Sequence, residues 1–270
     1  MTNEDEFSKK YGNLIGQGKT ASIYEKDGIV AKVFIKEFPK TEIYHEAHIM
    51  TLIEAVGIQS TRVFGIETYL DRFVLKMNKI EGKALDDAFI DGDVTLEEFT
   101  DKLVEIETGI HKIHAANLGF MKKKDAFIRN IHWNKKLTDS EKSNLISRIN
   151  ELPDGDSICH GDFHGRNILT DGKNNIIIDW PEVSVGNPAA DACRTYFDYK
   201  YMVVYDKDNG VDPNMRDTVN KLCGMYLDKY SKASGISKED ILVWLPIIAA
   251  ALYGHVPNES INREIKSLIK

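Results

Sequence analysis

The side chains best suited to chemistry in this 270-residue chain lie between Ile158 and Asp179. Asp162 and Asn167 are five residues apart, and Asp179 follows twelve residues later, at the end of an apolar run. Phosphoryl transfer from a nucleotide needs a carboxylate beside the acceptor hydroxyl, and oxygen ligands that hold Mg²⁺ on the phosphates. We therefore predict phosphoryl-transfer chemistry, with Asp162 as the base or hydroxyl-orienting group and Asn167 and Asp179 as Mg²⁺ ligands.

The same segment allows a second interpretation. His160, Asp162 and His164 are alternate residues, and His and Asp side chains can bind Zn²⁺. A zinc site, however, leaves Asn167 and Asp179 without a role. The protein-kinase catalytic loop has its Asp and Asn at the same five-residue offset, and a His two residues before the Asp, where His160 stands here. We therefore favour phosphoryl transfer over zinc-dependent hydrolysis.

A glycine loop and a lysine near the N-terminus complete the pattern. The segment from Gly16 to Gly18 lies between two strand-like runs, and the apolar run from Ile29 to Phe34 contains one charged residue, Lys32. A lysine in a buried strand is costly unless it is paired. We predict that Gly16, Gly18 and Ser22 belong to a flap over the nucleotide, and that Lys32 binds its phosphates. Ala21 stands where the third glycine of a G-x-G-x-x-G fingerprint would be.

The lysine needs an acidic partner, which we expect on a helix over residues 41–56. Apolar residues recur there at helical spacing, namely Ile43, Ala47, Met50 and Ile53. Glu46 adjoins this apolar stripe, so we predict that it pairs with Lys32.

Taken together, these motifs resemble those of the aminoglycoside phosphotransferase and choline-kinase superfamily of small-molecule kinases. The matching segments are Gly16-Gln17-Gly18, Lys32, Glu46-Ala47, Met77 to Gly82, Ile113-His114-Ala115, His160 to Asn167, Ile178-Asp179-Trp180 and Gly186 to Asp191. The resemblance fades after about Cys193. It implies an α+β, two-lobed protein-kinase-like fold with a small antiparallel-sheet N-terminal lobe that has one helix, and a larger, mainly helical C-terminal lobe.

The resemblance also implies ATP or GTP as the donor, bound with Mg²⁺ between the lobes. It implies that the backbone near Asn78 and Ile80 binds the base. The corresponding division is an N-terminal nucleotide-binding lobe at 1–77, a hinge at 78–82 and a catalytic and acceptor-binding lobe at 83–270. A hairpin with Asp171-Gly172 at its turn should return Asp179 to Asn167, and Asp191 should accept backbone N–H bonds from the catalytic loop.

Two helices are expected in the C-terminal part. Thr95 and Glu98 form a capping-box pattern at the start of a helix over 95–116, in which His111 is expected at the surface and His114 in packing. Residues 241–254 are the longest near-apolar run and suit a buried helix, since they are too short to span a bilayer and contain Pro246.

The composition is ordinary for a soluble globular protein. The net charge is −7 with 42% hydrophobic residues, and the chain has no basic domain that would indicate nucleic-acid binding. Three cysteines without a C-x-x-C pattern favour free thiols in a reducing compartment. We expect a cytoplasmic monomer with no membrane or nucleic-acid partner.

The segment after Asp179 separates two classes of kinase. Asp179 is followed by Trp-Pro in place of the Phe-Gly of D-F-G, no A-P-E occurs, and only eleven residues separate Asp179 from Asp191. A peptide-binding activation segment does not fit there. We expect a kinase of small hydroxyl compounds, with a nucleotide-binding regulatory module without turnover as the alternative and a protein kinase less favoured.

The acceptor stays open among aminoglycosides, amino alcohols such as choline, sugars, homoserine-like compounds and macrolides. Specificity is expected after Trp180, through Glu182, Asp198 and Tyr199. An aromatic and acidic cluster there would suit a cation, although ordinary helix packing explains it too; its members are Tyr196, Phe197, Tyr199, Tyr201, Tyr205, Asp198, Asp206 and Asp208. The basic run from Lys122 to Lys136 is interpreted as a solvated surface. If it formed the acceptor-binding site instead, an anionic acceptor would be favoured.

Overall fold

The computed structural model describes residues 3–202, 213–256 and 258–269. The chain forms two compact units: Met1–Lys83 with Ile168–Pro181, and Ala84–Asn167 with Glu182–Lys270. The segment Ile168–Pro181 thus belongs to the first unit, although it lies far along the chain. The division expected from the sequence places this segment in the C-terminal lobe.

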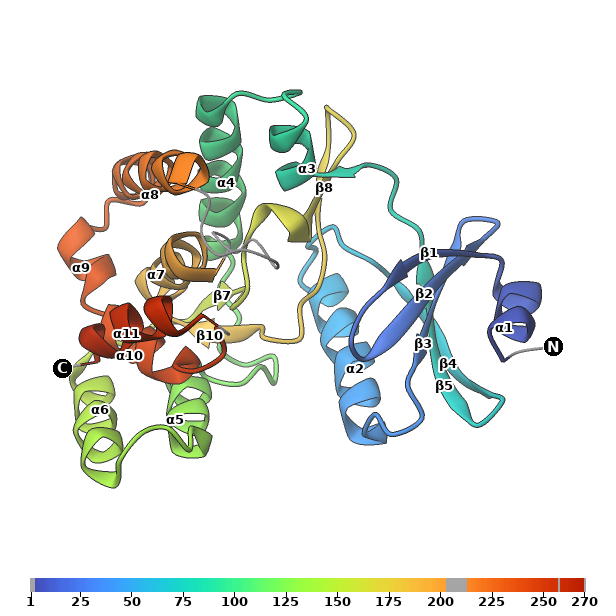
Figure 1. The fold of residues 1–270 in the computed structure, drawn as a ribbon, viewed down its shortest axis with the longest axis horizontal. Coiled ribbons are helices and arrows are strands. Elements are labelled where there is room, and N and C mark those ends of the chain that lie inside the picture. Colours follow the sequence, from blue (N-terminus) through green and yellow to red (C-terminus); the bar gives the residue numbers. More distant parts are fainter. Residues whose placement is uncertain (1–2, 203–212, 257, 270) are drawn as a thin grey trace. The chain divides into compact units, whose positions relative to one another are not determined.

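The first unit is built on a five-stranded antiparallel sheet with strand order β1-β2-β3-β5-β4 (Figure 1). Asp27 and Gly28 form the turn between β2 and β3, both with positive φ, as the Asp-Gly pair predicts. The strands are β1 (Asn13–Gln17), β2 (Ala21–Lys26), β3 (Ile29–Phe34), β4 (Val63–Tyr69) and β5 (Arg72–Asn78).

Two helices accompany this sheet, α1 (Asn3–Tyr11) and α2 (Lys40–Ala55). Alternate strand residues point to opposite faces, so Val33 packs with Phe7 of α1, while Phe34 packs with Ile43 of α2. Lys32 has the same parity as Phe34 and therefore faces α2. Helix α1 is an addition to the single helix expected for this lobe.

A short hairpin completes the first unit. Its strands are β8 (Ile168–Thr170) and β9 (Asn175–Ile177), and Ile168 pairs with Ile177. The Asp171 carboxylate accepts hydrogen bonds from the backbone N–H groups of Lys173 and Asn174, which fixes the turn. The hairpin predicted with Asp171-Gly172 at its turn is therefore present.

The second unit is mainly helical, with a two-stranded antiparallel sheet of β7 (Ser157–Cys159) and β10 (Ser184–Gly186). The short β6 (Lys83–Ala84) lies where the chain passes from the first unit to the second. The helices are α3 (Leu85–Ile90), α4 (Leu96–His111), α5 (Lys123–Trp133), α6 (Asp139–Glu151), α7 (Pro188–Phe197), α8 (Pro213–Ser234), α9 (Lys238–Leu242), α10 (Leu245–Leu252) and α11 (Glu259–Leu268), with a 3₁₀ turn at Gly165–Asn167 and a π turn at Asp198–Met202.

The core of the second unit forms around α7 and α10. Helix α10 packs against α5, α7 and α11, and α4 lies beside α8 (Figure 1). Trp244 and Phe197 are almost fully buried in this core, together with the residues of α10 from Ile247 to Ala251. The core therefore holds α5, α7 and α10 in place. These three helices carry side chains of the sites described below.

The helix predictions hold in part. Thr95 and Glu98 form the predicted capping box of α4, but this helix ends at His111 rather than near residue 116. The buried run at 241–254 forms two helices, α9 and α10, because Pro246 can only stand in the first turn of a helix, here that of α10. The fold class is confirmed: a mixed α+β chain has an antiparallel-sheet N-terminal part and a helical C-terminal part.

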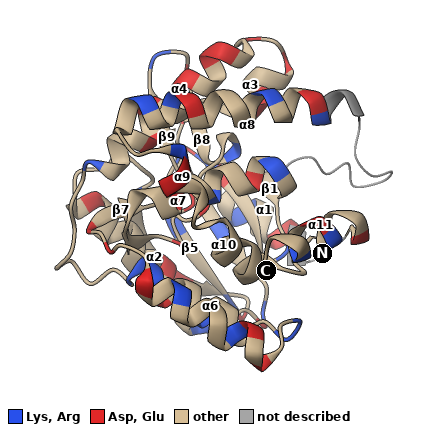
Figure 2. Ribbon diagram, turned by 90° about the vertical axis from the view of Figure 1, so that its left-hand side faces the viewer, with Lys and Arg blue, Asp and Glu red and all other residues tan. Residues whose placement is uncertain are grey.

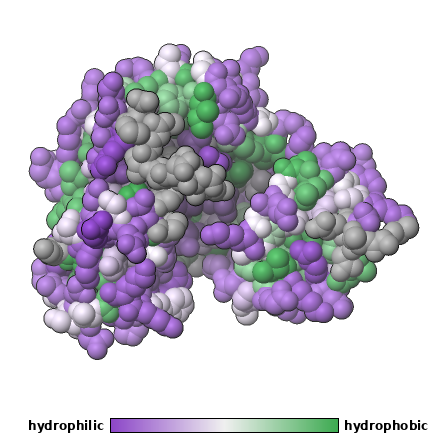
Figure 3. All heavy atoms as spheres, in the orientation of Figure 1, coloured by the Kyte–Doolittle hydropathy of each residue, from purple (hydrophilic) through white to green (hydrophobic). Residues whose placement is uncertain are grey.

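Acidic and basic side chains are interspersed on the outer helices. Figure 2 shows both signs along α8, where Lys229 pairs with Glu97 and Asp101 of α4. The visible face in Figure 3 is largely hydrophilic, with small hydrophobic patches. In the described ranges, no helix is both long and apolar enough to cross a membrane.

Candidate active site

A cavity of about 550 Å³ lies entirely within the first unit. Its walls are mostly apolar, and apart from Thr61 the polar side chains in them come from the segments that the sequence singles out. The lining includes Ile15, Ile23, Val30, Lys32, Glu46, Ile49, Met50, Thr61, Met77, Asn78, Lys79, Ile80, Leu169, Ile178, Asp179 and Trp180. A largely apolar cavity with a few polar groups is the usual form of a small-molecule site.

Lys32 and Glu46 form the predicted ion pair in this cavity. The Lys32 Nζ lies 2.7 Å from Glu46 Oε1, and both side chains are largely buried, with exposed fractions of 20% and 14%. The pair forms because the strand parity of Lys32 and the helical phase of Glu46 direct both side chains into the space between β3 and α2. One carboxylate therefore holds the lysine, whose ammonium retains donors for a further anion.

The segment after β5 forms another wall. Asn78 Oδ1 accepts a hydrogen bond from the Arg62 backbone N–H at 2.5 Å, and Lys79 N–H donates to Gly28 O at 2.9 Å. Within the described residues, no hydrogen bond involves the backbone N–H of Ile80. The side chain of Asn78 thus serves the fold, and the backbone at Ile80 is available to a ligand.

Asp179 lies on the cavity wall in a left-handed backbone conformation, with φ of 65°. The next residue fixes this turn: the buried Trp180 donates from its indole Nε1 to Ser60 Oγ at 3.0 Å, and Ser60 Oγ donates to Ile177 O. Asp179 is exposed, and among the described residues nothing pairs with its carboxylate. The turn presents an unpaired carboxylate, as a cation ligand requires.

The glycine loop joins β1 to β2 beside the cavity wall formed by Ile15 and Ile23. Gly16 ends the bulged part of β1 opposite Ile23, and Gly18 N–H donates to Ala21 O at 2.9 Å. Neither glycine has a positive φ, and an added Cβ at either would lie 3.6 Å from its nearest neighbour. Gly16, Gly18 and Ser22 do not line the cavity; Ile15 and Ile23 do. Their predicted role in nucleotide binding therefore rests on the resemblance.

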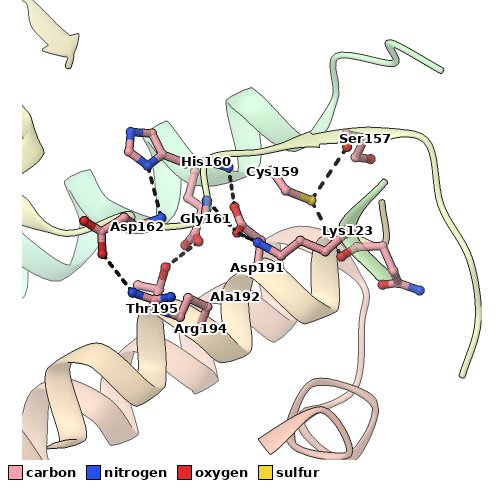
Figure 4. Close-up of polar contacts among 12 residues, drawn as sticks. Lys123, Ser157, Cys159, His160, Gly161, Asp162, Asp191, Ala192, Arg194 and Thr195 are labelled. Carbon is pink, nitrogen blue, oxygen red and sulfur yellow. Dashed lines mark hydrogen bonds and ion pairs between the residues drawn. The ribbon is translucent and has the colours of Figure 1, made fainter. Parts of the chain in front are cut away.

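In the second unit, Asp191 of α7 holds the start of the loop at residues 160–167. Its carboxylate accepts the backbone N–H of His160 at 2.7 Å and that of Gly161 at 2.9 Å (Figure 4). Lys123 Nζ binds the same carboxylate at 2.7 Å, and His111 Nε2 lies 3.2 Å from it. The predicted backbone contacts of Asp191 are present, and its pKa is strongly lowered because Lys123 and His111 outweigh the effect of burial.

Three expectations about this region were wrong. His111 is buried, not at the surface, since it hydrogen-bonds both Asp191 and Tyr230; His114 is exposed and binds Asp156. Lys123 belongs to the run that reads as solvated, yet its side chain is only 5% exposed. The buried positions of His111 and Lys123 have one cause, because both side chains bind the buried Asp191 carboxylate.

The far end of the 160–167 loop has a second support. Gly165 N–H donates to the hydroxyl of Tyr199 at 2.8 Å, and this hydroxyl lies 3.3 Å from Asp86. A Cβ on Gly165 would come within 2.2 Å of the Asp86 carboxylate, so only glycine fits there. Tyr199 is 3% exposed, and it therefore supports the loop and does not line an open acceptor pocket.

Asp162 is half-buried and binds Arg194 of α7. The guanidinium NH2 group donates to Asp162 Oδ1 at 2.9 Å (Figure 4). Its Nε donates to the buried Asp198 at 2.7 Å. Burial alone would raise the pKa of Asp162, but the neighbouring His164 and the charge of Arg194 lower it to about 2. Asp162 is therefore ionised at neutral pH. Desolvation raises the pKa of Asp198 to about 6.

Asn167 is buried in the same loop. Its Nδ2 donates to the backbone O of Asp162 at 2.9 Å, which fixes the orientation of the amide. No hydrogen bond reaches its Oδ1 from the part of the chain that the structure describes. The structure thus brings Asp162 and Asn167 together in the second unit, and Lys32, Glu46, Asn78, Ile80 and Asp179 together in the first.

The zinc interpretation finds no support. His160 Nδ1 accepts the Asp162 N–H, and His160, Asp162 and His164 do not converge as ligands. Among the described residues, the group with ligand atoms close enough for a metal is His111, Cys159 and Asp191. Lys123 already neutralises that carboxylate, and burial raises the pKa of the Cys159 thiol.

Sequence reasoning missed Arg194 and the cavity residue Thr61. A signal for Arg194 existed: it stands four residues before Asp198 on a helix, at the spacing of an ion pair. Asp198 is thereby buried and paired, so it does not face an acceptor. Tyr205, Asp206 and Asp208 of the expected acidic cluster lie outside the described residues, while Glu182 is exposed.

Solved structures show the same fold at low sequence identity. A thermostable mutant of aminoglycoside phosphotransferase APH(4)-Ia in ternary complex with AMP-PNP and hygromycin B has a TM-score of 0.67 at 14% identity, covering 98% of this chain and 97% of that one. The streptomycin-ATP-APH(2")-IIa complex has a TM-score of 0.57 at 16% identity, with coverage of 100% and 97%. APH(3'')-Id from Streptomyces rimosus, with ADP and streptomycin, has a TM-score of 0.56 at 14% identity, with coverage of 94% and 100%.

No curated protein matches the sequence significantly. The sequence profile of the phosphotransferase enzyme family, however, matches residues 23–206, which is more than half of the chain and includes every predicted site residue except Gly16, Gly18 and Ser22. The chain therefore belongs to the phosphotransferase enzyme family and is a phosphotransferase.

Proposed function

We propose that this enzyme transfers the γ-phosphoryl group of ATP or GTP to a hydroxyl of a small molecule. The observation that carries the proposal is the Lys32–Glu46 pair in an apolar cavity. The pair provides a fixed cation that can bind phosphate, and it lies beside apolar walls that can bind the nucleotide base. The similar structures named above contain AMP-PNP, ATP or ADP, which supports a nucleotide donor.

The nucleotide would bind in the first unit. Apolar side chains such as Val30, Met77 and Leu169 would cover the faces of the base. The backbone of Asn78 and Ile80 would bind its edge, since the Ile80 N–H has no partner in the described chain. Lys32 would bind the phosphates, with Gly16, Gly18 and Ser22 in the flap above them.

We assign Asn167 and Asp179 as ligands of Mg²⁺. Both fit the ion chemically, because Mg²⁺ takes oxygen ligands and usually only one or two carboxylates together with phosphates. The free Oδ1 of Asn167 and the unpaired carboxylate of Asp179 are such ligands. When bound, Mg²⁺ would neutralise phosphate charge during transfer.

Asp162 would orient the acceptor hydroxyl. A carboxylate with a pKa of about 2 is a weak base, whereas efficient general bases have a pKa nearer the working pH. The loose transition state of phosphoryl transfer needs little early deprotonation. Asp162 would therefore accept a hydrogen bond from the hydroxyl and take its proton late, while Arg194 keeps the carboxylate in place.

The test is nucleotide binding and turnover by the Lys32→Met variant, which keeps the apolar stem and removes the charge. Loss of a charge-assisted hydrogen bond to phosphate should weaken binding of ATP by about tenfold or more. Lys76→Met is the matched control, since Lys76 also stands on a strand and pairs with a glutamate, Glu67, but does not line the cavity.

Calorimetry with Mg²⁺-ATP measures the affinity, and formation of ADP in the presence of hydroxyl compounds measures turnover. Equal ATP affinity in wild type and Lys32→Met would refute the assigned role of the lysine. A regulatory module without turnover would bind ATP but form no ADP with any hydroxyl compound.

A further inference from the structure

A second cavity, of about 380 Å³, lies entirely within the second unit. It is formed by the C-terminal ends of α5 and α10 and the segments that follow them, together with Glu182. Its lining includes Asn130, Trp133, Asn134, Lys135, Lys136, Glu182, Tyr253 and His255. None of these residues has a role in the nucleotide site described above.

The cavity borders the 160–167 loop. The backbone O of Glu182 lies so close to Gly161 that a Cβ there would come within 2.3 Å of it. The charge of Glu182 also acts on Arg194, which binds Asp162. Glu182, which lines the cavity, therefore connects it to the loop that carries Asp162.

The cavity wall is preformed. Asn134 Nδ2 donates to Ala250 O at 2.9 Å and to Tyr253 O at 3.0 Å, which joins the end of α5 to the end of α10. Its Oδ1 accepts the Lys136 backbone N–H at 2.9 Å. The Arg129 guanidinium lies 5.6 Å from the centre of the Trp133 ring and stacks on it. The walls are thus ordered before a ligand binds, so binding does not incur the entropy cost of ordering them.

Trp133 is the unusual residue of this wall. Its side chain is 69% exposed, whereas Trp180 and Trp244 are each 1% exposed. A large exposed aromatic ring at the edge of a cavity is a common feature of binding sites, because it offers contact area at low entropy cost. The ring would stack against a flat or ring-shaped part of a ligand.

The charges at this cavity favour an anion. Lys135 and Lys136 line the cavity and Arg129 lies over the ring of Trp133, and no carboxylate pairs with any of these three side chains within the described ranges. Cations elsewhere in this unit, such as Lys229 and Lys266, are neutralised by acidic side chains. The one acidic side chain in the lining is Glu182.

We propose that this cavity binds the acceptor, and that the acceptor is a ring-bearing hydroxyl compound with an anionic substituent. The proposal rests on the proposed function and narrows its substrate class: Trp133 stacks on the ring, Lys135 and Lys136 bind the carboxylate or phosphate, and Glu182 accepts a hydrogen bond from a hydroxyl. A polycationic acceptor is disfavoured by the same lysines.

The test uses four ring compounds that differ in charge: glucuronate, glucose 6-phosphate, glucose and glucosamine. Binding to the whole protein is measured by calorimetry without nucleotide. At least one anionic compound should bind about tenfold more tightly than glucosamine. The comparison of glucuronate with glucose 6-phosphate tells a carboxylate from a phosphate ligand.

Two variants locate the site. Lys135→Glu with Lys136→Glu should weaken binding of the anionic compound by about tenfold or more, and Trp133→Ala should weaken all ring compounds. Lys221→Glu with Lys232→Glu is the matched control, since these exposed lysines of α8 give the same charge change away from the cavity. It should leave binding unchanged.

The inference is overturned if glucosamine binds more tightly than both anionic compounds, if no anionic compound binds at millimolar concentration, or if both double variants weaken binding equally. The proposed function fails separately, if the wild-type protein forms no ADP and no phosphate ester from Mg²⁺-ATP and any hydroxyl compound. Binding of the anionic compound would still stand in that case.

Discussion

Replacing Asp191 by Asn should cost a large part of the folding free energy of the second unit. Asp191 is 1% exposed and neutralises Lys123, whose side chain is only 5% exposed. The substitution keeps the shape but leaves a buried ammonium without its carboxylate. It also places an amide NH2 among groups that donate, namely the N–H groups of His160 and Gly161.

Breaking a buried ion pair by removing one partner costs about 3–5 kcal/mol. That is a large fraction of the roughly 5–15 kcal/mol that stabilises a typical domain. Urea unfolding should therefore show a much lower midpoint in Asp191→Asn, with an unchanged slope. Glu105→Gln, at an exposed position of α4, is the control and should change stability by less than about 0.5 kcal/mol.

A double-mutant cycle isolates the pair. Lys123→Met removes the ammonium, while Asp191 keeps His111 and two backbone N–H groups. The variant that combines both substitutions should lose less stability than the sum of the single losses, by about 2 kcal/mol. A loss below about 1 kcal/mol in Asp191→Asn, or additive losses in the cycle, would refute the reasoning that this carboxylate is held by its buried partner.

Two further predictions concern pH and metal. Burial raises the pKa of Glu107 to about 7. The folded state therefore retains a proton that the unfolded state releases near pH 4.3. The free energy of unfolding should consequently fall by about 3 kcal/mol as the pH rises from 4 to 7. Glu107→Gln should flatten this part of the curve in urea unfolding against pH, with Glu105→Gln as control, and an unchanged slope would contradict the assignment. Asp179→Ala should abolish Mg²⁺-dependent turnover; a Mg²⁺ titration of ADP formation identical to that of wild type would place the metal elsewhere.

Periodic patterns in the sequence predicted contacts in which both partners lie on helices or strands. Strand alternation and helical phase were enough for Lys32 and Glu46. The capping box of Thr95 was equally readable, because its partner is three residues away. The backbone contacts of Asp191 were expected from the family resemblance, and they are present.

Contacts that depend on packing between distant segments were not predictable. Arg194 reaches Asp162 only because α7 packs beneath the 160–167 loop. Tyr199 looked like an acceptor-site residue, but a π turn directs it into the interior, where it supports Gly165. Lys123 stands in a run of basic residues that suggested a solvated surface. Its side chain is nevertheless buried, because it binds the carboxylate of Asp191, which is 68 residues away in the sequence.

The most direct test of the central claim is detection of a phosphorylated small molecule by phosphorus NMR. Wild-type protein is incubated with Mg²⁺-ATP and a panel of small hydroxyl compounds, and Asp162→Asn is compared at equal ATP saturation. We predict a new phosphate-ester signal with wild type, formed about a hundredfold more slowly by the variant, because a positioned acid–base group is lost. Equal rates in the two proteins, or a wild type that forms no phosphate ester with any compound, would contradict the account.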